Sequence, residues 1–96
     1  MVSLNVTDLT RIAKETGVPD HLIEGLIAYA VDRRPTGDFL KSVLSNDLFG
    51  ALQRADSRSL NGLLRIAAFV QYHLPYDSFG SEEIVSRWLS RTNSVT

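Results

Sequence analysis

Cysteine is absent from this sequence, and its absence removes several classes of chemistry at once. Without a thiol, the chain can form no disulfide, no thiolate metal site and no cysteine nucleophile. Long apolar runs are missing too, since none approaches the ~18 residues that a membrane-spanning helix needs. The N-terminus does not show the basic-then-apolar layout of a signal peptide. We therefore expect a protein that works inside a cell.

A surplus of charge of one sign is also lacking. Ten basic residues stand against eleven acidic ones, which gives a formal net charge of −1. This balance argues against a general affinity for nucleic acid or for anionic membranes. The 96 residues, of which 44% are hydrophobic and 22% charged, suffice for one domain with one modest core.

Apolar residues recur with helical spacing in every segment, and no run alternates with the period of two that strands show. The first expected helix covers residues 8–16, with Thr7 as its N-cap and Gly17 as its left-handed stop. A second helix starts at Pro19 and ends near Asp32 or Arg33, ahead of Pro35. Its expected buried stripe consists of Leu22, Ile23, Leu26, Ile27 and Ala30.

The middle of the chain allows two interpretations. An apolar stripe resumes at Asp38 and is interrupted by three cap-forming residues, 45–47. We expect Asn46 to be the N-cap of a new helix, whose apolar face would be Leu48, Ala51, Leu52 and Ala55. The alternative is one continuous helix over residues 38–55, because the apolar phase carries through the interruption.

The last third of the chain predicts two more helices. Residues 56–59 suggest a turn and a cap, and Pro75 ends the helix that follows. The expected inward stripe of that helix is Leu60, Leu63, Leu64, Ala67, Val70 and Leu74. Ser81 caps a final helix that buries Ile84, Val85, Trp88 and Leu89, and a polar tail starts at Arg91. The sequence thus predicts an all-α bundle of five or six short helices.

One set of residues, spread from about Leu26 to Leu89 over roughly two-thirds of the chain, forms a recognisable pattern. Its members are Pro35, Gly37, Phe39, Leu40, Val43, Leu44, Asn46, Asp47, Leu48, Ala51, Arg54, Ala55, Asp56, Pro75, Gly80, Ser81, Glu83, Val85 and Trp88. In these residues the sequence resembles a widespread group of small, mostly uncharacterised proteins encoded by phages and prophages. The resemblance implies a viral or prophage origin, an intracellular helical protein in a bacterial host cytoplasm, and no known catalytic residues.

Residues 9–30 have the spacing of a helix-turn-helix unit, with Gly17 in the turn. The second helix of this unit would expose Asp20, His21 and Glu24, and it has no Arg, Lys, Asn or Gln to reach base edges. Its carboxylates would repel phosphate. DNA binding by residues 9–30 is therefore the alternative function rather than the first.

Catalytic and metal chemistry find little support. His21 and Glu24 share a helix face, but zinc needs three or four ligands, and the other histidine, His73, is far along the chain. If Asp47 and Asp56 lay on one helix, roughly 13 Å would separate them, too far for a carboxylate pair. We expect neither an enzyme nor a cofactor. An enzyme or accessory subunit whose site is assembled in a multimer is the least favoured hypothesis.

Four residues are candidates for binding a protein partner. Arg54 and Asp56 cannot pair with each other at i and i+2, so they either tie the helix end to another segment, which we favour, or present a charged epitope. Tyr76 and Phe79 lie in the loop before the last helix, where they either close the core, which we favour, or form an exposed anchor. The resulting hypothesis is a non-enzymatic helical protein that binds a host or viral protein.

Overall fold

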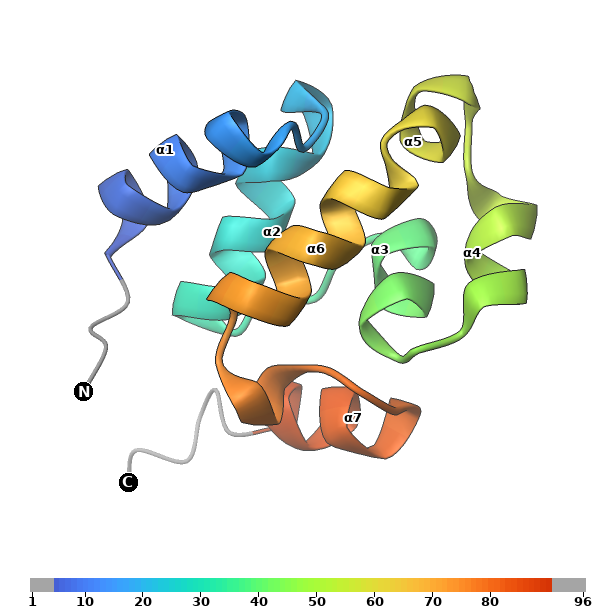
Figure 1. Ribbon diagram of the computed structural model, residues 1–96. Coiled ribbons are helices and arrows are strands. Elements are labelled where there is room, and N and C mark those ends of the chain that lie inside the picture. Colours follow the sequence, from blue (N-terminus) through green and yellow to red (C-terminus); the bar gives the residue numbers. More distant parts are fainter. Residues whose placement is uncertain (1–4, 91–96) are drawn as a thin grey trace.

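Every regular element that the structure describes is helical. The computed structural model describes residues 5–90 (Figure 1). The all-α class predicted from the sequence is therefore confirmed, although the chain forms seven α-helices rather than five or six over these residues. The elements are α1 (Val6–Thr16), α2 (Asp20–Asp32), α3 (Asp38–Leu44), α4 (Leu48–Arg54), α5 (Ser57–Asn61), α6 (Leu63–His73), the 3-10 turn η1 (Tyr76–Ser78) and α7 (Glu82–Ser90).

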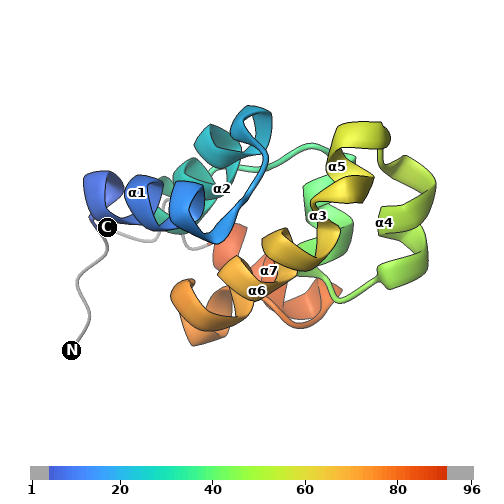
Figure 2. The ribbon, with the colours of Figure 1, turned by 45° about the horizontal axis from the view of Figure 1, so that its top comes forward.

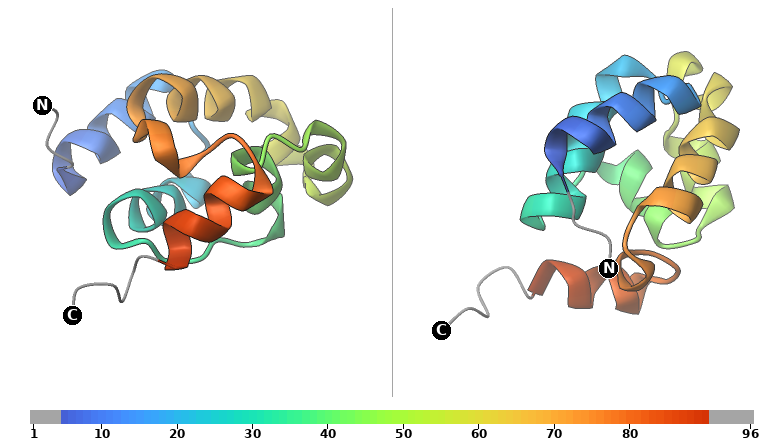
Figure 3. Two further views of the ribbon diagram at one scale, coloured as in Figure 1. Left: turned by 90° about the horizontal axis from the view of Figure 1, so that it is seen from below. Right: turned by 60° about the vertical axis from the view of Figure 1, so that its left-hand side comes forward.

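The helices form two groups joined across the middle of the molecule. The α1–α2 pair makes one end, and α3 packs against α4 near the other end, with α5 beside them (Figures 1 and 2). Helix α6 runs between the two ends and also contacts α1. Seen from below, α7 lies under α2 and α3 (Figure 3). This layout leaves α4 and α5 at the edge of the molecule, where they are covered on one side only.

The core is centred on α2, whose Tyr29 is fully buried. The Tyr29 hydroxyl donates a 2.7 Å hydrogen bond to the carbonyl of Ser78, and the Trp88 indole N–H donates a 2.8 Å bond to the carbonyl of Tyr29. The Arg33 guanidinium lies 3.5 Å from the centre of the Trp88 ring. Burial raises the pKa of the Tyr29 hydroxyl to about 12, with Arg33 opposing the shift. These contacts bind α2 to the C-terminal part of the chain.

The first helix differs from its prediction at one end only. Asn5, and not Thr7, is its N-cap, because the Asn5 side-chain oxygen accepts the N–H of Asp8 at 3.1 Å. The helix consequently begins two residues earlier than expected. Gly17 ends it in the left-handed region, with φ of 98°, as predicted. In α2 the expected stripe is confirmed, although Leu22 is only partly buried.

The break between α3 and α4 is confirmed, but its mechanism differs from the prediction. Asn46 is not an N-cap: it has a φ of 63° and terminates α3 in the left-handed conformation that Asn tolerates better than most residues. The N–H of Asn46 donates to the carbonyl of Val43, and that of Asp47 to Ser42, the bonding of a Schellman motif. Asp47 is the N-cap of α4, because its carboxylate accepts the N–H of Gly50 at 2.9 Å.

The helix predicted after residue 59 is wrong in its start and in part of its inward face, although Val70 and Leu74 are buried as predicted. Asp56 caps a short helix, α5, and the helical conformation is interrupted at Gly62 before α6 begins. A side chain at Gly62 would meet the ring of Pro19, with 2.5 Å between its Cβ and the Pro19 Cγ. The buried side chains of α6 are Ile66, Phe69 and Val70, whereas the expected Leu60, Leu64 and Ala67 are exposed.

The final helix follows its prediction. The Ser81 hydroxyl accepts the N–H of Ile84 at 3.1 Å, as an N-cap does, and Val85 and Trp88 are buried. Glu82 and Glu83 lie in the first turn, where a negative charge suits the helix dipole. The predicted polar tail from Arg91 lies outside the described residues.

Candidate interaction surfaces

Large apolar side chains are exposed along α4, α5 and the start of α6. We call these five residues the apolar face: Leu48 (55% exposed), Phe49 (75%), Leu52 (41%), Leu60 (48%) and Leu64 (84%). Leu48 and Leu52 are one turn apart on α4, and Leu60 and Leu64 have the same spacing across the Gly62 break. The predicted burial of Leu48, Leu52, Leu60 and Leu64 is therefore wrong.

Small residues occupy the inward side of these same helices. Gly50 and Ala51 are the buried residues of α4, and Ser59 is the buried residue of α5. Gly62, between α5 and α6, is buried as well. The usual arrangement of an amphipathic helix, with large apolar residues inside and polar ones outside, is thus inverted at this end of the molecule. The Pro19 ring leaves no room for a side chain at Gly62, and the Asp47 carboxylate and the Arg54 guanidinium leave none at Gly50. Neither contact accounts for the leucines and the phenylalanine that face outward.

A shallow hollow continues the apolar face toward the last third of the chain. It has a volume of about 230 Å³ and lies between the end of α3, the outer side of α6 and the loop before α7. Val43, Ala67 and Phe79 contribute apolar lining. Ala67 is three residues after Leu64, on the same side of α6. The apolar surface therefore extends from α6 into a depression where a partner side chain can insert.

Arg54 and Asp56 border this surface, and both make structural bonds. The Arg54 guanidinium donates a 3.2 Å bond to the carbonyl of Gly50 within α4. The Asp56 carboxylate accepts the N–H of Ser59 at 2.7 Å and lies 3.9 Å from His21 Nε2 on α2. The hydrogen bonds from Ser59, and then the charge of His21, hold the pKa of Asp56 below its usual value.

The structural use that we favoured for these two residues has a geometric basis, since Asp56 brings α5 close to α2. Both side chains are nevertheless exposed at the surface. Arg54 and Asp56 therefore stay candidates for the charged rim of a partner-binding surface.

Tyr76 and Phe79 do not form a pair. Tyr76 is 91% exposed, so the prediction that it closes the core is wrong for this residue. Phe79 is half-buried and packs against the core, as we favoured for it. Tyr72, at the end of α6, is 77% exposed and lines the same groove as Tyr76, beside Pro75. The exposed aromatic surface near η1 is therefore made of Tyr72 and Tyr76.

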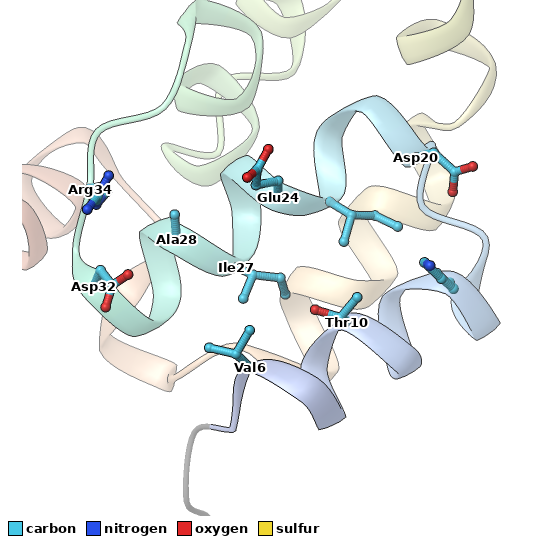
Figure 4. Close-up of a pocket in the computed structure, with 10 residues that line it drawn as sticks. Val6, Thr10, Asp20, Glu24, Ile27, Ala28, Asp32 and Arg34 are labelled. Carbon is cyan, nitrogen blue, oxygen red and sulfur yellow. The ribbon is translucent and has the colours of Figure 1, made fainter.

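A wider groove of about 730 Å³ lies between α1 and α2 (Figure 4). Ile23, Ile27 and Ala28 of α2 form its floor, and Val6 of α1 is half-exposed at its edge. Its charged lining residues are Asp20, Glu24 and Asp32, with Lys14 and Arg34. This is the same pair of helices that has helix-turn-helix spacing. Asp20 and Glu24 are exposed on the would-be recognition helix, and their charge opposes the approach of phosphate.

Metal ligands do not converge in the part of the chain that the structure describes. No three His, Asp or Glu side chains between residues 5 and 90 are grouped so that they could hold an ion. His21 Nε2 lies 3.2 Å from the Ser59 hydroxyl, and the ring of His73 lies 5.7 Å from that of Phe69. Within the same residues no helix is both long and apolar enough to cross a membrane.

Comparison of the chain with protein-family models, with curated proteins and with solved structures gives no match. The resemblance to phage and prophage proteins therefore stays a prediction. Function has to be inferred from the surfaces of the molecule itself.

Proposed function

We propose that this protein is a small, non-enzymatic interaction module of phage or prophage origin, which binds a host or viral protein through the apolar face. The observation that carries the proposal is the inverted pattern of α4 and α5, with Gly50, Ala51 and Ser59 inside and Leu48 and Phe49 outside. Folding alone gives no reason for this arrangement, because polar residues at the outward positions would satisfy the fold equally well.

The exposure and composition of the apolar face support protein binding, because contiguous exposed apolar patches often mark interaction sites. Phe49 has an aromatic ring that is 75% exposed, and Leu64 is 84% exposed, so both can bury most of their surface on a partner. Aromatic side chains bring large contact area at the cost of few rotatable bonds. Arg54 and Asp56 provide a polar rim of the kind that surrounds such contacts.

The test is capture of partners from a bacterial lysate by tagged wild-type protein and by the double variant Phe49→Ser, Leu64→Ser. The variant should lose affinity for the captured protein by roughly 2 kcal/mol or more, about thirtyfold in Kd. Its melting temperature should stay close to that of the wild type, because both side chains are exposed.

The matched control is the double variant Tyr72→Ser, Tyr76→Ser, which removes two aromatic rings that are equally exposed but lie near η1. It should capture the same protein as the wild type. Equal capture by the wild type and the Phe49, Leu64 variant would overturn the proposal. Loss in the tyrosine variant alone would move the binding site to Tyr72 and Tyr76.

The alternative, a DNA-binding regulator that uses residues 9–30, is weaker because Asp20 and Glu24 occupy the exposed surface of α2. A mobility-shift assay at low salt decides it, since even non-specific binding to DNA is strongest there. A shift that disappears on substitution within α2 would favour the regulator. We further propose that the protein acts in the cytoplasm of the bacterial host; the resemblance to phage and prophage proteins and the lack of cysteine support this.

A further inference from the structure

We propose that Asn61 and Gly62 form a self-modifying junction between α5 and α6, at which the Asn61 side chain is converted to aspartate or isoaspartate without an enzyme. The reaction is deamidation through a cyclic imide, in which the residue after the asparagine supplies the attacking nitrogen. Asn61 is the exposed last residue of α5, and Gly62 follows it at the helix break. Of the four asparagines in the sequence, only Asn61 precedes a glycine.

The reaction consumes one water molecule and releases one ammonia molecule, with no oxidation or reduction. The backbone nitrogen of Gly62 forms a bond to the side-chain carbon Cγ of Asn61 and gives up its proton to solvent. The bond between Cγ and the side-chain nitrogen then breaks, and that nitrogen leaves as ammonia with a proton from solvent. Water opens the resulting succinimide ring at one of its two carbonyls, which gives either aspartate or isoaspartate.

The fold requires a glycine at position 62. A Cβ there would lie 2.5 Å from the Pro19 Cγ, so the Pro19 ring excludes a side chain. Because glycine has no Cβ, nothing attached to Gly62 shields its nitrogen from the Asn61 side chain, and its backbone rotates more freely than that of any other residue. Packing against Pro19 therefore keeps an unshielded amide nitrogen directly after Asn61.

The Asn61 side chain is not held away from this nitrogen. It is exposed, and it makes no hydrogen bond to any of residues 5–90. The side chain of Asn5, by contrast, accepts the N–H of Asp8 at 3.1 Å. The nitrogen that follows Asn46 belongs to Asp47, which has a Cβ and donates a 2.8 Å bond to the carbonyl of Ser42. Among the asparagines that the structure describes, Asn61 is therefore the one free to react.

The helical conformation restrains the reaction while α5 is intact. The N–H of Gly62 is shared between the carbonyls of Arg58 and Ser59, each 3.2 Å away. The nitrogen can attack only after it leaves both carbonyls and Asn61 rotates out of the helix. Helix α5 has five residues, far fewer than a helix needs to persist by itself, and it lies at the edge of the molecule (Figure 1). Local opening of α5 therefore controls the rate.

Conversion alters the apolar face. Leu60 and Leu64 lie on either side of the junction with the spacing of one helical turn. An aspartate at position 61 places a negative charge between them. An isoaspartate carries the main chain through the former side chain, which lengthens the chain by one carbon and breaks this spacing. The loss of partner binding that should follow rests on the proposed function, whereas the reaction itself does not.

The experiment is incubation of the folded full chain in neutral buffer at physiological temperature, followed by peptide mapping with mass spectrometry. Asn61 should convert at least about tenfold faster than Asn5 and Asn46 in the same molecules, because no side chain shields the Gly62 nitrogen. The control is Asn61→Gln, whose longer side chain would have to close a larger ring and should stay unconverted. Conversion of Asn61 that is no faster than that of Asn5 and Asn46 overturns the inference.

Two cap variants test whether opening of α5 controls the rate. Asp56→Ala removes the N-cap of α5 and should accelerate conversion of Asn61 about fivefold, the change in population that the loss of a cap produces. The matched control, Asp47→Ala, removes the N-cap of α4 and should leave the rate at Asn61 unchanged. Equal acceleration in the two variants, or none in either, overturns the inference.

Hydrogen exchange of the wild type checks the opening without any substitution. The N–H of Gly62 should exchange faster than that of Phe69, which lies in the buried part of α6. Slower exchange at Gly62 than at Phe69 overturns the inference. This measurement keeps the test decisive even where the Asp56→Ala protein does not fold.

The outcome for the proposed function is separate. Converted wild-type protein should lose its captured partner, while the Asn61→Gln protein incubated for the same time should keep it. Fresh protein that captures no partner through Phe49 and Leu64 would remove the proposed function, and conversion at Asn61 would still establish the reaction. Converted protein that captures the partner as well as fresh protein does would overturn the effect on the apolar face.

Discussion

The junction between α3 and α4 offers the sharpest test of how this chain starts and stops its helices. In the structure, different residues end α3 and begin α4. Asn46 terminates α3 in the left-handed region, and the Asp47 carboxylate caps α4 by accepting the N–H of Gly50. Replacing Asp47 with alanine removes the cap but leaves the turn. Replacing Asn46 with glycine keeps the turn, because glycine adopts a positive φ without a steric cost.

The expected magnitudes separate these roles. Asp47→Ala should cost about 1 kcal/mol, the usual loss for an N-cap, and Asp47→Asn should cost much less because Asn caps nearly as well as Asp. Asn46→Ala should also cost about 1 kcal/mol, since an alanine is strained at a φ of 63°. Asn46→Gly should change stability little. For a domain of this size, 1 kcal/mol corresponds to a shift of about 4–8 °C in melting temperature.

Thermal melts and urea titrations of the four variants measure these differences directly. The decisive comparison is Asp47→Ala with Asn46→Gly. If Asp47→Ala were neutral while both Asn46 variants lost about 1 kcal/mol, the Asn46 side chain would be the cap and the reasoning would be refuted. If all four variants were neutral, residues 45–47 would not control the helix ends at all.

Three further predictions concern other contacts of the fold. Gly62→Ala should destabilise the protein by about 1–3 kcal/mol in urea titrations, because the overlap of its Cβ with the Pro19 ring outweighs the gain in helix propensity of roughly 1 kcal/mol. Tyr29→Phe should cost about 1–3 kcal/mol, since the buried carbonyl of Ser78 loses its donor. The pKa of Tyr29 is raised to about 12 from 10.0, so the stability that its neutral hydroxyl contributes is complete below pH 10 and is lost as pH rises toward 12. In the Tyr29→Phe variant, the free energy of unfolding should not show this decrease at alkaline pH. The pKa of Asp56 is lowered from 3.8, so the stability that its charge provides is present above that pH and is lost as pH falls through the lowered pKa; the difference in stability between wild type and Asp56→Asn should therefore shrink on acidification.

The helices that could be predicted are those whose apolar face and stop signals agree. In α2 a dense stripe of large apolar residues is followed by Pro35, and in α7 Ser81 precedes two glutamates and the buried Trp88. Both elements lie where the sequence indicates. The sequence does not fix Thr7 as the N-cap of α1, because Asn5, two residues earlier, is at least as good an N-cap.

The inward faces of α4 and α5 could be predicted only at Ala51, because the large apolar residues of these two helices point outward. Periodicity shows which side of a helix is apolar, and it takes that side to be buried. In α4 the buried side consists of Gly50 and Ala51. Gly50 does not stand out in an apolar pattern, and only the structure shows that a Cβ there would meet the Asp47 carboxylate. The Gly62 break was missed for a similar reason, since only the position of Pro19 in space shows why a side chain is excluded there.

The candidate site residues could likewise be predicted only in part. Arg54, Asp56, Tyr76 and Phe79 were singled out from the sequence, but only the fold distinguishes the exposed Tyr76 from the half-buried Phe79. Phe49 and Leu64, which carry the proposed function, were not singled out. One signal was present in the sequence: Leu48 and Phe49 are consecutive in a helix, so they cannot both share the face of Ala51.

The bond between Tyr29 and Ser78, together with the indole of Trp88 on the Tyr29 carbonyl, has a consequence for how the chain is made. A ribosome synthesises α2 first, but the acceptor of the Tyr29 hydroxyl and the ring beside it arrive only with residues 78–88. The centre of the core therefore cannot be completed until α7 has been synthesised, so it does not form progressively from the N-terminal helices. Because Trp88 is the only tryptophan, its fluorescence would time that last step directly. A chain that is cut short before α7 should keep helices yet lack a closed interior, and proteases in the cell would remove it.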